Sequence, residues 1–327
     1  MMRIATISAG TVALVLSTGA PVLADDEVVL RFPHEAPDST IKGRTITHFA
    51  ELVEEYSGGV VRVEVFSGGQ LMPAPEETRA AIRGEADIVA PQTSYFSSLD
   101  DIFDVYYQPM LFGSFEQAMD FVDGEMGQEL LDRLERVGLV GLGTWHDGPG
   151  YLFVQGEPIM DVEDVAGKRI RVFPSNPLEQ GVRAAGAVPV SMPAADVFLS
   201  LQQGVVDGVI TTPTYAGPTG WGEALDSMTR MMMFMGGYGV VMNAEAWGNL
   251  AEDQQDAVLR AMANATAWNI EASLENIEDA EERLSSDGVT LHDLSPEQLA
   301  AWQDVMEPVY AEQSDELQGL ISQIRGD

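Results

Sequence analysis

The sequence predicts an α/β fold that is divided into two lobes. With 327 residues, the chain is longer than a single hydrophobic core usually organises. Short apolar strands alternate with amphipathic helices along its first hundred residues, an order typical of a parallel sheet with crossover helices. A helical segment at residues 253–284 is unusually long, and a helix of that length would brace both lobes.

The first lobe is expected to open with a strand at residues 28–32 and a helix at residues 44–57. Apolar residues recur in this helix at a spacing of three and four, and a pair of glycines ends it. The remaining elements predicted for this lobe are a strand at residues 60–66, a helix at residues 74–84 and a strand at residues 86–91.

The same alternation then repeats in a second lobe. Strands are expected at residues 137–145, 168–173, 187–193 and 206–213, and helices at residues 177–186 and 195–204. The apolar run at residues 230–235 predicts a further buried strand, and the chain becomes helical again from Pro296.

The chain is strongly acidic. It carries 52 acidic residues against 17 basic ones, a formal net charge of −35, and its only lysines are Lys42 and Lys168. A surface of this sign repels phosphate backbones and anionic membranes, so nucleic acid is not an expected partner. The excess is typical of a protein adapted to high salt, where screening weakens the repulsion between like charges.

Residues 1–24 are predicted to be a secretory signal peptide. Arg3 precedes an apolar run at residues 4–20, and small residues at Val22 and Ala24 predict cleavage after Ala24. An uncleaved membrane anchor is the alternative, because the apolar run nears the length of a span. The chain has no cysteine, so disulfides and thiol chemistry are excluded, and a soluble periplasmic protein is expected.

Candidate ligand contacts follow the ends of the predicted strands, where ligands lie in parallel α/β sheets. Besides the arginine discussed next, the candidates are His34, Glu35, Gln92, Tyr95, Trp145, Asn176, Met192, Thr212 and Tyr215. Each has a structural alternative: an ordinary turn for His34 and Glu35, core packing for Trp145 and helix capping for Asn176.

Two arginines, Arg169 and Arg171, alternate with apolar residues in the strand at residues 168–173. A guanidinium offers two parallel donors to a carboxylate and so fixes its orientation as well as its charge. Arg171 is therefore a candidate for a ligand carboxylate, and the alternative is a structural ion pair with one of the 52 acids. Arg169 is expected to serve packing or a surface ion pair.

The sequence gives no indication of an enzyme. None of the histidines, His34, His48, His146 and His292, has the spacing of a zinc-binding His-Glu-x-x-His motif. No Gly-x-Ser-x-Gly nucleophile motif occurs, and the glycine-rich segments lack the lysine of a phosphate-binding loop. We therefore predict no catalytic residue, no metal site and no cofactor.

Several segments together resemble the solute-binding proteins of tripartite ATP-independent periplasmic (TRAP) transporters, the DctP family. They occur in the family's order over nearly the whole mature chain, and together they are specific. The segments are "FAELVEEYSGGVVRVEVFSGGQL", "YYQPMLF", "GKRIRV", "AAGAVPVSMPAADVFLSLQQGVVDG" and "MNAEAWGNLAEDQQDAV".

The resemblance implies a two-lobed periplasmic binding protein fold with crossing hinge strands and a long helix spanning both lobes. It implies lobe I at residues 25–145 plus 236–275 and lobe II at residues 146–235 plus 276–327. It also implies a cleft that closes on a small organic acid, an ion pair between Arg171 and the ligand's carboxylate, and delivery to the small and large membrane subunits of a sodium-coupled permease. The alternatives are a binding protein of an ATP-driven importer and a periplasmic protein that feeds a sensor.

The sequence departs from the family pattern at positions expected to shape the cleft. Gly150 stands where many relatives carry a second arginine, and Ala194 stands where many carry an aromatic residue. Thr211 and Thr212 replace an asparagine and a glutamate. These departures predict a monocarboxylate with a larger and less polar body, of aromatic or branched form.

Overall fold

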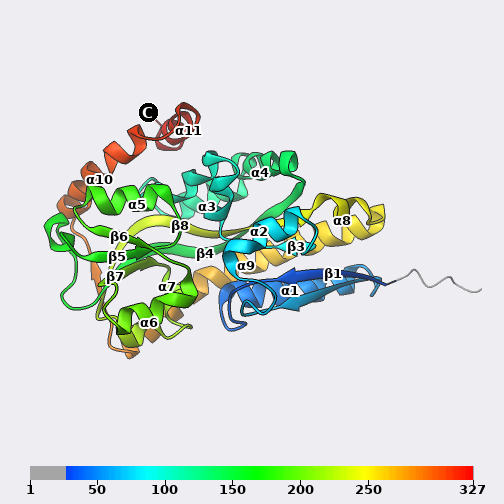
Figure 1. The fold of residues 1–327 in the computed structure, drawn as a ribbon, viewed down its shortest axis with the longest axis horizontal. Coiled ribbons are helices and arrows are strands. Elements are labelled where there is room, and N and C mark those ends of the chain that lie inside the picture. The colour runs from blue at the N-terminus through cyan, green and yellow to red at the C-terminus, as the bar shows by residue number, and fades with distance from the viewer. Residues whose placement is uncertain (1–26, 327) are drawn as a thin grey trace, which may run out of the picture.

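The computed structural model describes residues 27–326, and the predicted signal peptide lies outside the described residues. The architecture is the expected α/β fold, and Figure 1 shows two groups of elements that share a pair of long strands. The long strands are β4 (Leu139–Val154) and β8 (Ser227–Asn243), which run antiparallel to each other.

The N-terminal elements follow the predicted alternation. Strands β1 (Val28–Pro33) and β2 (Val61–Phe66) pair in parallel across the crossover helix α1 (Ile41–Tyr56). Helix α2 (Ala74–Ile82) leads into the short strand β3 (Ile88–Val89), which pairs with the C-terminal end of β8. An apolar cluster under these elements contains Phe32, Phe49 and Trp145, whose rings stack or meet edge to face.

Two short helices, α3 (Phe115–Asp123) and α4 (Glu125–Asp132), precede β4. The prediction that the strand ends at Trp145 is wrong, because β4 continues through His146 to Val154. The continuation is stable because β8 pairs with β4 along almost its whole length, from Leu139 opposite Asn243 to Val154 opposite Ser227.

The second group of elements is built on the C-terminal half of β4. The larger sheet has the order β3-β8-β4-β7-β5-β6, and β9 pairs with the first residues of β8, on the same edge that β3 uses at its C-terminal end. Its elements are β5 (Arg169–Val172), α5 (Asn176–Ala184), β6 (Val188–Ser191), α6 (Val197–Gln202), β7 (Gly208–Thr211), α7 (Pro213–Ala216) and β9 (Thr290–Asp293).

The predicted long helix is α9 (Glu252–Ser286), which follows α8 (Ala244–Gly248) and has 35 residues. In Figure 1 it runs past both groups of elements. At its middle, the buried Asn269 accepts a hydrogen bond from the His146 N–H (2.6 Å) and donates to the His146 carbonyl and the Thr45 hydroxyl (both 3.1 Å). The helix is thereby fixed to β4 where this strand crosses the molecule. The chain ends with α10 (Pro296–Ala311) and α11 (Asp315–Arg325).

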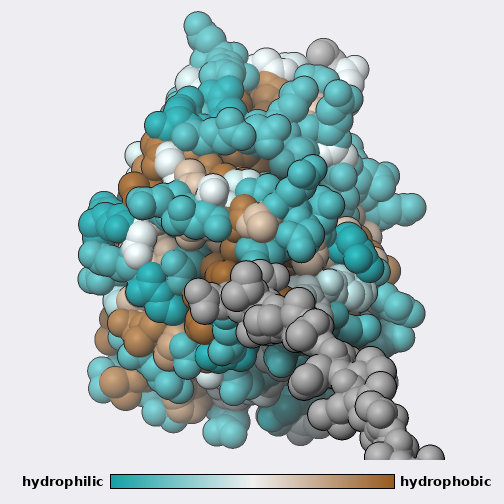
Figure 2. Space-filling model, turned by 90° about the vertical axis from the view of Figure 1, so that its right-hand side faces the viewer, coloured by the Kyte–Doolittle hydropathy of each residue, from teal (hydrophilic) through white to brown (hydrophobic). Residues whose placement is uncertain are grey.

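The surface is largely polar. Hydrophilic residues dominate the face shown in Figure 2, and the apolar areas on it are small and scattered. Among residues 27–326, no helix combines the length and the apolar character that a membrane span requires.

Candidate ligand-binding site

A small polar pocket, with a cavity volume of about 30 Å³, lies where the two groups of elements and the long strands meet. Its walls come from the loop after β1, the segment after β3, strands β4, β5, β7 and β8, and the segments that follow β6 and β7. The lining residues are Glu35, Gln92, Asp147, Arg171, Phe173, Ala194, Thr211, Thr212, Tyr215, Trp221, Phe234 and Tyr238.

Arg171 lies on β5 and is buried, with 3% of its surface exposed. Its Nε and Nη2 donate to the Met192 carbonyl oxygen at 3.1 and 2.9 Å, and the Phe173 and Trp221 rings lie 5.8 and 5.7 Å from its guanidinium carbon. Within the described part of the chain, Arg171 forms no ion pair with an acid. Burial lowers its pKa to about 10, so the guanidinium is a cation at neutral pH without an anionic partner.

Arg169, two residues earlier, differs from Arg171 in its partner. Its Nη2 lies 2.6 Å from Asp207 Oδ1, and its backbone N–H donates to Asp207 Oδ2 at 2.7 Å. The Arg169 side chain is 43% exposed, so this is the surface ion pair that was one of its two expected roles. A positive charge in this strand therefore does not by itself indicate a ligand contact. Arg171 differs from Arg169 because it is buried without an acidic partner among the described residues.

Asp147 is brought into the pocket by a β-bulge. His146 pairs with Gly237 and Gly148 with Gly236, so Asp147 is the extra residue between them. Gly148 has a φ of +109°, which a residue with a side chain rarely adopts.

The Asp147 carboxylate accepts a hydrogen bond from Thr212 Oγ1 at 2.8 Å and a longer one from Thr214 Oγ1 at 3.3 Å. Burial raises the pKa of Asp147 to about 6, against the influence of these donors, so the buried group is still largely ionised at pH 7.

A second acidic group lies across the pocket. Glu35 Oε2 is 2.5 Å from the fully buried Lys42 Nζ, and this cation lowers the pKa of Glu35 against the effect of burial. Burial raises the pKa of nearby Glu77 well above its ordinary value. Burial and the Lys42 charge lower the pKa of His34 to about 4, so this imidazole is neutral as well.

Five of the predicted contacts, Glu35, Gln92, Arg171, Thr212 and Tyr215, line this one pocket. Two others lie close to Arg171. Met192 contributes its carbonyl oxygen to the guanidinium, and the Tyr95 phenol interacts electrostatically with Glu35 and Arg171. Burial raises the pKa of Tyr95 to about 12.

Three predicted contacts, Trp145, His34 and Asn176, are not in the pocket lining. Trp145 is fully buried between Phe32 and Phe49, so its ring is part of the core. His34 is also fully buried, and Asn176 is exposed at the first residue of α5. The structural alternative, core packing, describes Trp145. Asn176 is not the helix cap that was its alternative, because Ser175 is the N-cap of α5 and no side chain caps this helix.

Sequence reasoning missed several residues of the lining. Asp147 lies beyond the predicted strand end at Trp145, although the glycine that follows it is a signal of a bulge. The aromatic residues that were missed have no local signal, because they come from three different segments. They are Phe173, Trp221, Phe234 and Tyr238.

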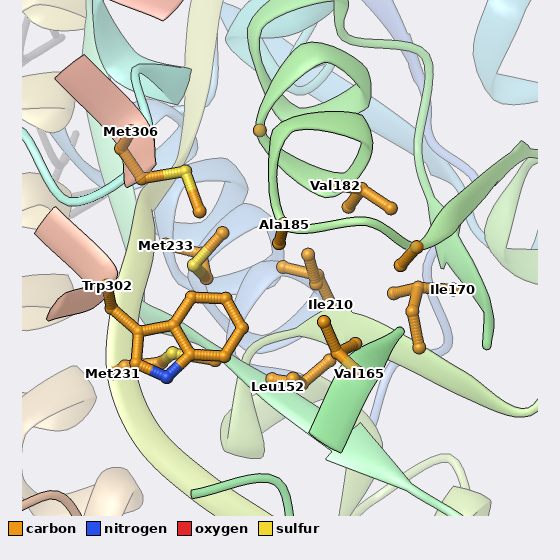
Figure 3. A pocket seen from close by; sticks show the side chains of 12 residues that line it. Leu152, Val165, Ile170, Val182, Ala185, Ile210, Met231, Met233, Trp302 and Met306 are labelled. Atoms are coloured by element: carbon orange, nitrogen blue, oxygen red, sulfur yellow. The ribbon is translucent and has the colours of Figure 1, made fainter. Parts of the chain in front are cut away.

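A second, smaller cavity of about 10 Å³ lies between β5, β7, β8, α5 and α10. Figure 3 shows apolar side chains converging on it, among them Ile170, Ile210, Met231, Met233 and Trp302. Its only polar side-chain group, the Trp302 indole N–H, donates to the Met160 carbonyl at 3.1 Å. With no charged group in its lining, this cavity is a gap in the core and not a site for an anion.

No metal site was found in the described part of the chain, where no three His, Cys, Asp or Glu residues are grouped as ligands. The polar pocket offers charges and hydrogen bonds. It combines a buried cation without an acidic partner, two acidic side chains and several aromatic walls, which together can hold a small polar molecule by orientation-specific contacts.

Comparisons with known proteins agree with this description. Residues 32–316 match the family described as bacterial extracellular solute-binding protein, family 7. The C4-dicarboxylate-binding periplasmic protein DctP of Rhodobacter capsulatus is 32% identical over 317 residues, covering 96% of this chain and 95% of the relative.

Solved structures show the same fold. A TRAP periplasmic solute-binding protein of Sulfurospirillum deleyianum with bound succinate has a TM-score of 0.85 and 32% identity, covering 92% of this chain and 99% of that one. The sugar-acid-binding protein of Advenella mimigardefordensis in complex with galactonate has a TM-score of 0.87 and 25% identity, covering 92% and 99%. The chain therefore belongs to family 7 of the bacterial extracellular solute-binding proteins, the DctP family of TRAP-transporter binding proteins, whose members are receptors for small organic acids.

Proposed function

We propose that this protein captures a small organic acid in the periplasm by pairing one ligand carboxylate with Arg171. It then delivers the acid to the small and large membrane subunits of a sodium-coupled TRAP permease. The observation that carries the proposal is the state of Arg171, a buried cation that lines the pocket and has no acidic partner among the described residues.

The energetics favour an anionic ligand at this position. A buried charge without a counter-ion is costly, and removing one partner of a buried pair costs roughly 3–5 kcal/mol. Charge-assisted hydrogen bonds contribute about 1.5–3 kcal/mol each. A carboxylate that occupies the free side of the guanidinium provides both terms, and the Met192 carbonyl and the two flanking rings hold the guanidinium in place for it.

We further propose that the ligand has a single carboxylate and a less polar body. A β-carbon added at Gly150 would lie 1.9 Å from Phe234 Cε1, so the Phe234 ring fills the space of a side chain at that position. No arginine fits at Gly150 unless Phe234 moves, and the wall that faces the ligand there is aromatic. The small side chains of Ala194, Thr211 and Thr212 line the rest of the pocket.

The names of the relatives supply the competing ligand class. The Rhodobacter capsulatus protein is named for C4-dicarboxylates, and the Sulfurospirillum deleyianum structure contains succinate, whereas galactonate carries one carboxylate. A dicarboxylate would need a second cation in this pocket. Within the described residues the lining offers only Arg171, since the ammonium of Lys42 is paired with Glu35.

We propose that lobe I comprises residues 25–145 plus 236–275 and lobe II residues 146–235 plus 276–327. The pairing of the long strands supports this division. The short strand β3 pairs with β8 at Val241 and Met242, whereas β7 pairs with β4 between Tyr151 and Val154. The bulge around Asp147 lies between these two regions, where a change of backbone angles would let the lobes close.

The proposal is tested by calorimetric titration of organic acids against the unmodified protein and against two matched variants. Arg171→Lys keeps the charge but loses the paired donors, and we expect it to weaken carboxylate binding about 10- to 100-fold. Arg169→Lys changes the same residue type two positions away in a surface ion pair and should leave binding unchanged. Equal affinity of both variants for the acids would contradict the role of Arg171.

The membrane partner is tested separately from the ligand. Uptake of the identified acid into vesicles that contain both membrane subunits should require this protein and a sodium gradient. Uptake driven by ATP hydrolysis would instead support the binding protein of an ATP-driven importer. Turnover of the bound acid by the purified protein would contradict a pure binding role.

A further inference from the structure

The pocket contains two acidic side chains in addition to Arg171. Asp147 and Glu35 both line it, and the Tyr215 phenol interacts electrostatically with Glu35, Arg171 and Asp147 at once. One small space therefore brings together a guanidinium and two carboxylates. The part of a ligand that does not lie on Arg171 meets these carboxylates, which in their ionised form accept hydrogen bonds and donate none.

Among the described residues that line this pocket, Arg171 is the cation and Glu35 and Asp147 are the carboxylates. Glu35 is paired with Lys42, so Arg171 and Asp147 remain as one cation and one carboxylate without an ionic partner of their own. An acid with one carboxylate and no cation adds a net charge of −1 to a buried space, and a dicarboxylate adds −2. A molecule that carries one carboxylate and one protonated nitrogen leaves the balance at zero, which avoids an uncompensated buried charge.

The acidic groups also have free acceptor capacity. The two oxygens of an ionised carboxylate offer about four lone-pair positions, and the hydroxyls of Thr212, Thr214 and Tyr238 donate to the Asp147 carboxylate. The Glu35 carboxylate accepts from Lys42 and from Glu77, and the Glu35 side chain keeps 21% of its surface accessible. Asp147 itself is 2% exposed, so its carboxylate is held in the pocket wall with little access to bulk water.

We propose that the ligand is a small zwitterion, in which one carboxylate binds Arg171 and a protonated nitrogen lies between Asp147 and Glu35. Amino acids and their cyclic or N-substituted derivatives are the chemical class that fits this description. This inference rests on the proposed function, because it needs the carboxylate on Arg171. The aromatic rings of Tyr215, Phe234 and Tyr238 give such a molecule an apolar wall for its carbon skeleton and a favourable surface for its cation.

The test compares acids that differ in one group. Each set has one carbon skeleton and carries an amine, a hydroxyl or a hydrogen next to the carboxylate: valine, 2-hydroxyisovalerate and isovalerate, and the corresponding phenylalanine set. Proline is compared with tetrahydrofuran-2-carboxylate and cyclopentanecarboxylate. Calorimetry on the unmodified protein should rank the amine first in at least one set, by about 10- to 100-fold over the plain acid.

Two variants separate recognition of the nitrogen from a general loss of folding. Asp147→Asn should lower the affinity for the amine about tenfold or more while the affinity for the plain acid stays the same or rises. Asp279→Asn, at an exposed position on α9, removes the same charge outside the pocket and should change neither affinity.

The inference is overturned if no amine-bearing acid binds more tightly than its hydroxyl and hydrogen counterparts in any set. It is also overturned if Asp147→Asn weakens all three members of a set equally. The proposed function survives either result, provided that acids without nitrogen still bind and still require Arg171. Loss of that requirement would contradict the proposed function itself.

Discussion

The clearest prediction for stability concerns Asp147, a carboxylate that the fold buries and the ligand is proposed to use. The substitution Asp147→Asn keeps the shape of the side chain and removes its charge. Groups from several elements face this carboxylate: the hydroxyls of Thr212, Thr214 and Tyr238 and, at longer range, the Lys42 ammonium. Burial outweighs their combined effect, because the pKa of Asp147 is raised from 3.8 to about 6.

The sign of the effect on stability follows from the two pKa values. The folded protein holds the Asp147 proton up to about pH 6, whereas the unfolded chain releases it near pH 3.8. Between these values the folded state binds more protons, so the free energy of unfolding falls as the pH rises. At about 1.4 kcal/mol per pH unit, the full loss is about 3 kcal/mol above pH 6.

The asparagine variant lacks this loss, because its side chain does not titrate. The free energy of unfolding of Asp147→Asn minus that of the unmodified protein should therefore increase by about 2–3 kcal/mol between pH 4 and pH 7. Urea unfolding of the ligand-free protein at half-unit pH steps measures this difference, and Asp279→Asn serves as the exposed control. A difference that is constant with pH, or that falls as the pH rises, would refute the reasoning.

Three further predictions concern the structure around the site, and urea unfolding measures each of them. Asn269→Leu should lower the free energy of unfolding by about 2–3 kcal/mol, because it leaves the buried backbone N–H of His146 without a partner. An orphaned group of this kind costs ~1–3 kcal/mol, so a loss below about 0.5 kcal/mol would show that water replaces the Asn269 side chain. Gly150→Ala should cost about 1–3 kcal/mol through its clash with Phe234, and the cost should shrink in a Phe234→Leu background; independent effects would contradict the contact. Lys42→Met should cost roughly 3–5 kcal/mol by leaving Glu35 without its cation, and adding Glu35→Gln should recover much of that loss; no recovery would argue against the pair.

The sequence predicted the order of elements well because local patterns carry it. The alternation of valines at residues 61–65 and the helical spacing around Phe49 are properties of short segments, and β2 and α1 formed there. The long helix α9 was also predicted within two residues at each end. Arg171 was singled out by the resemblance to the family, because arginines such as Arg31, Arg62 and Arg169 also lie in apolar strands.

The rest of the site depends on contacts between distant segments. The length of β4 is set by its pairing with β8, about ninety residues away. The local sequence predicted an end at Trp145, next to glycine-rich residues that form bulges within the strand. The same bulge brings Asp147 into the pocket, which no local pattern indicates. The place of Trp145 also depends on distant segments, because Phe32 and Phe49 from two earlier elements enclose its ring in the core.

The central claim is most directly tested by a crystal structure of the protein with the ligand that it retains through purification. We expect a ligand carboxylate oxygen at about 2.7–2.9 Å from a guanidinium nitrogen of Arg171, with the Met192 carbonyl still accepting on the other side. A ligand held elsewhere, with Arg171 paired to an aspartate or glutamate of the chain, would contradict the account.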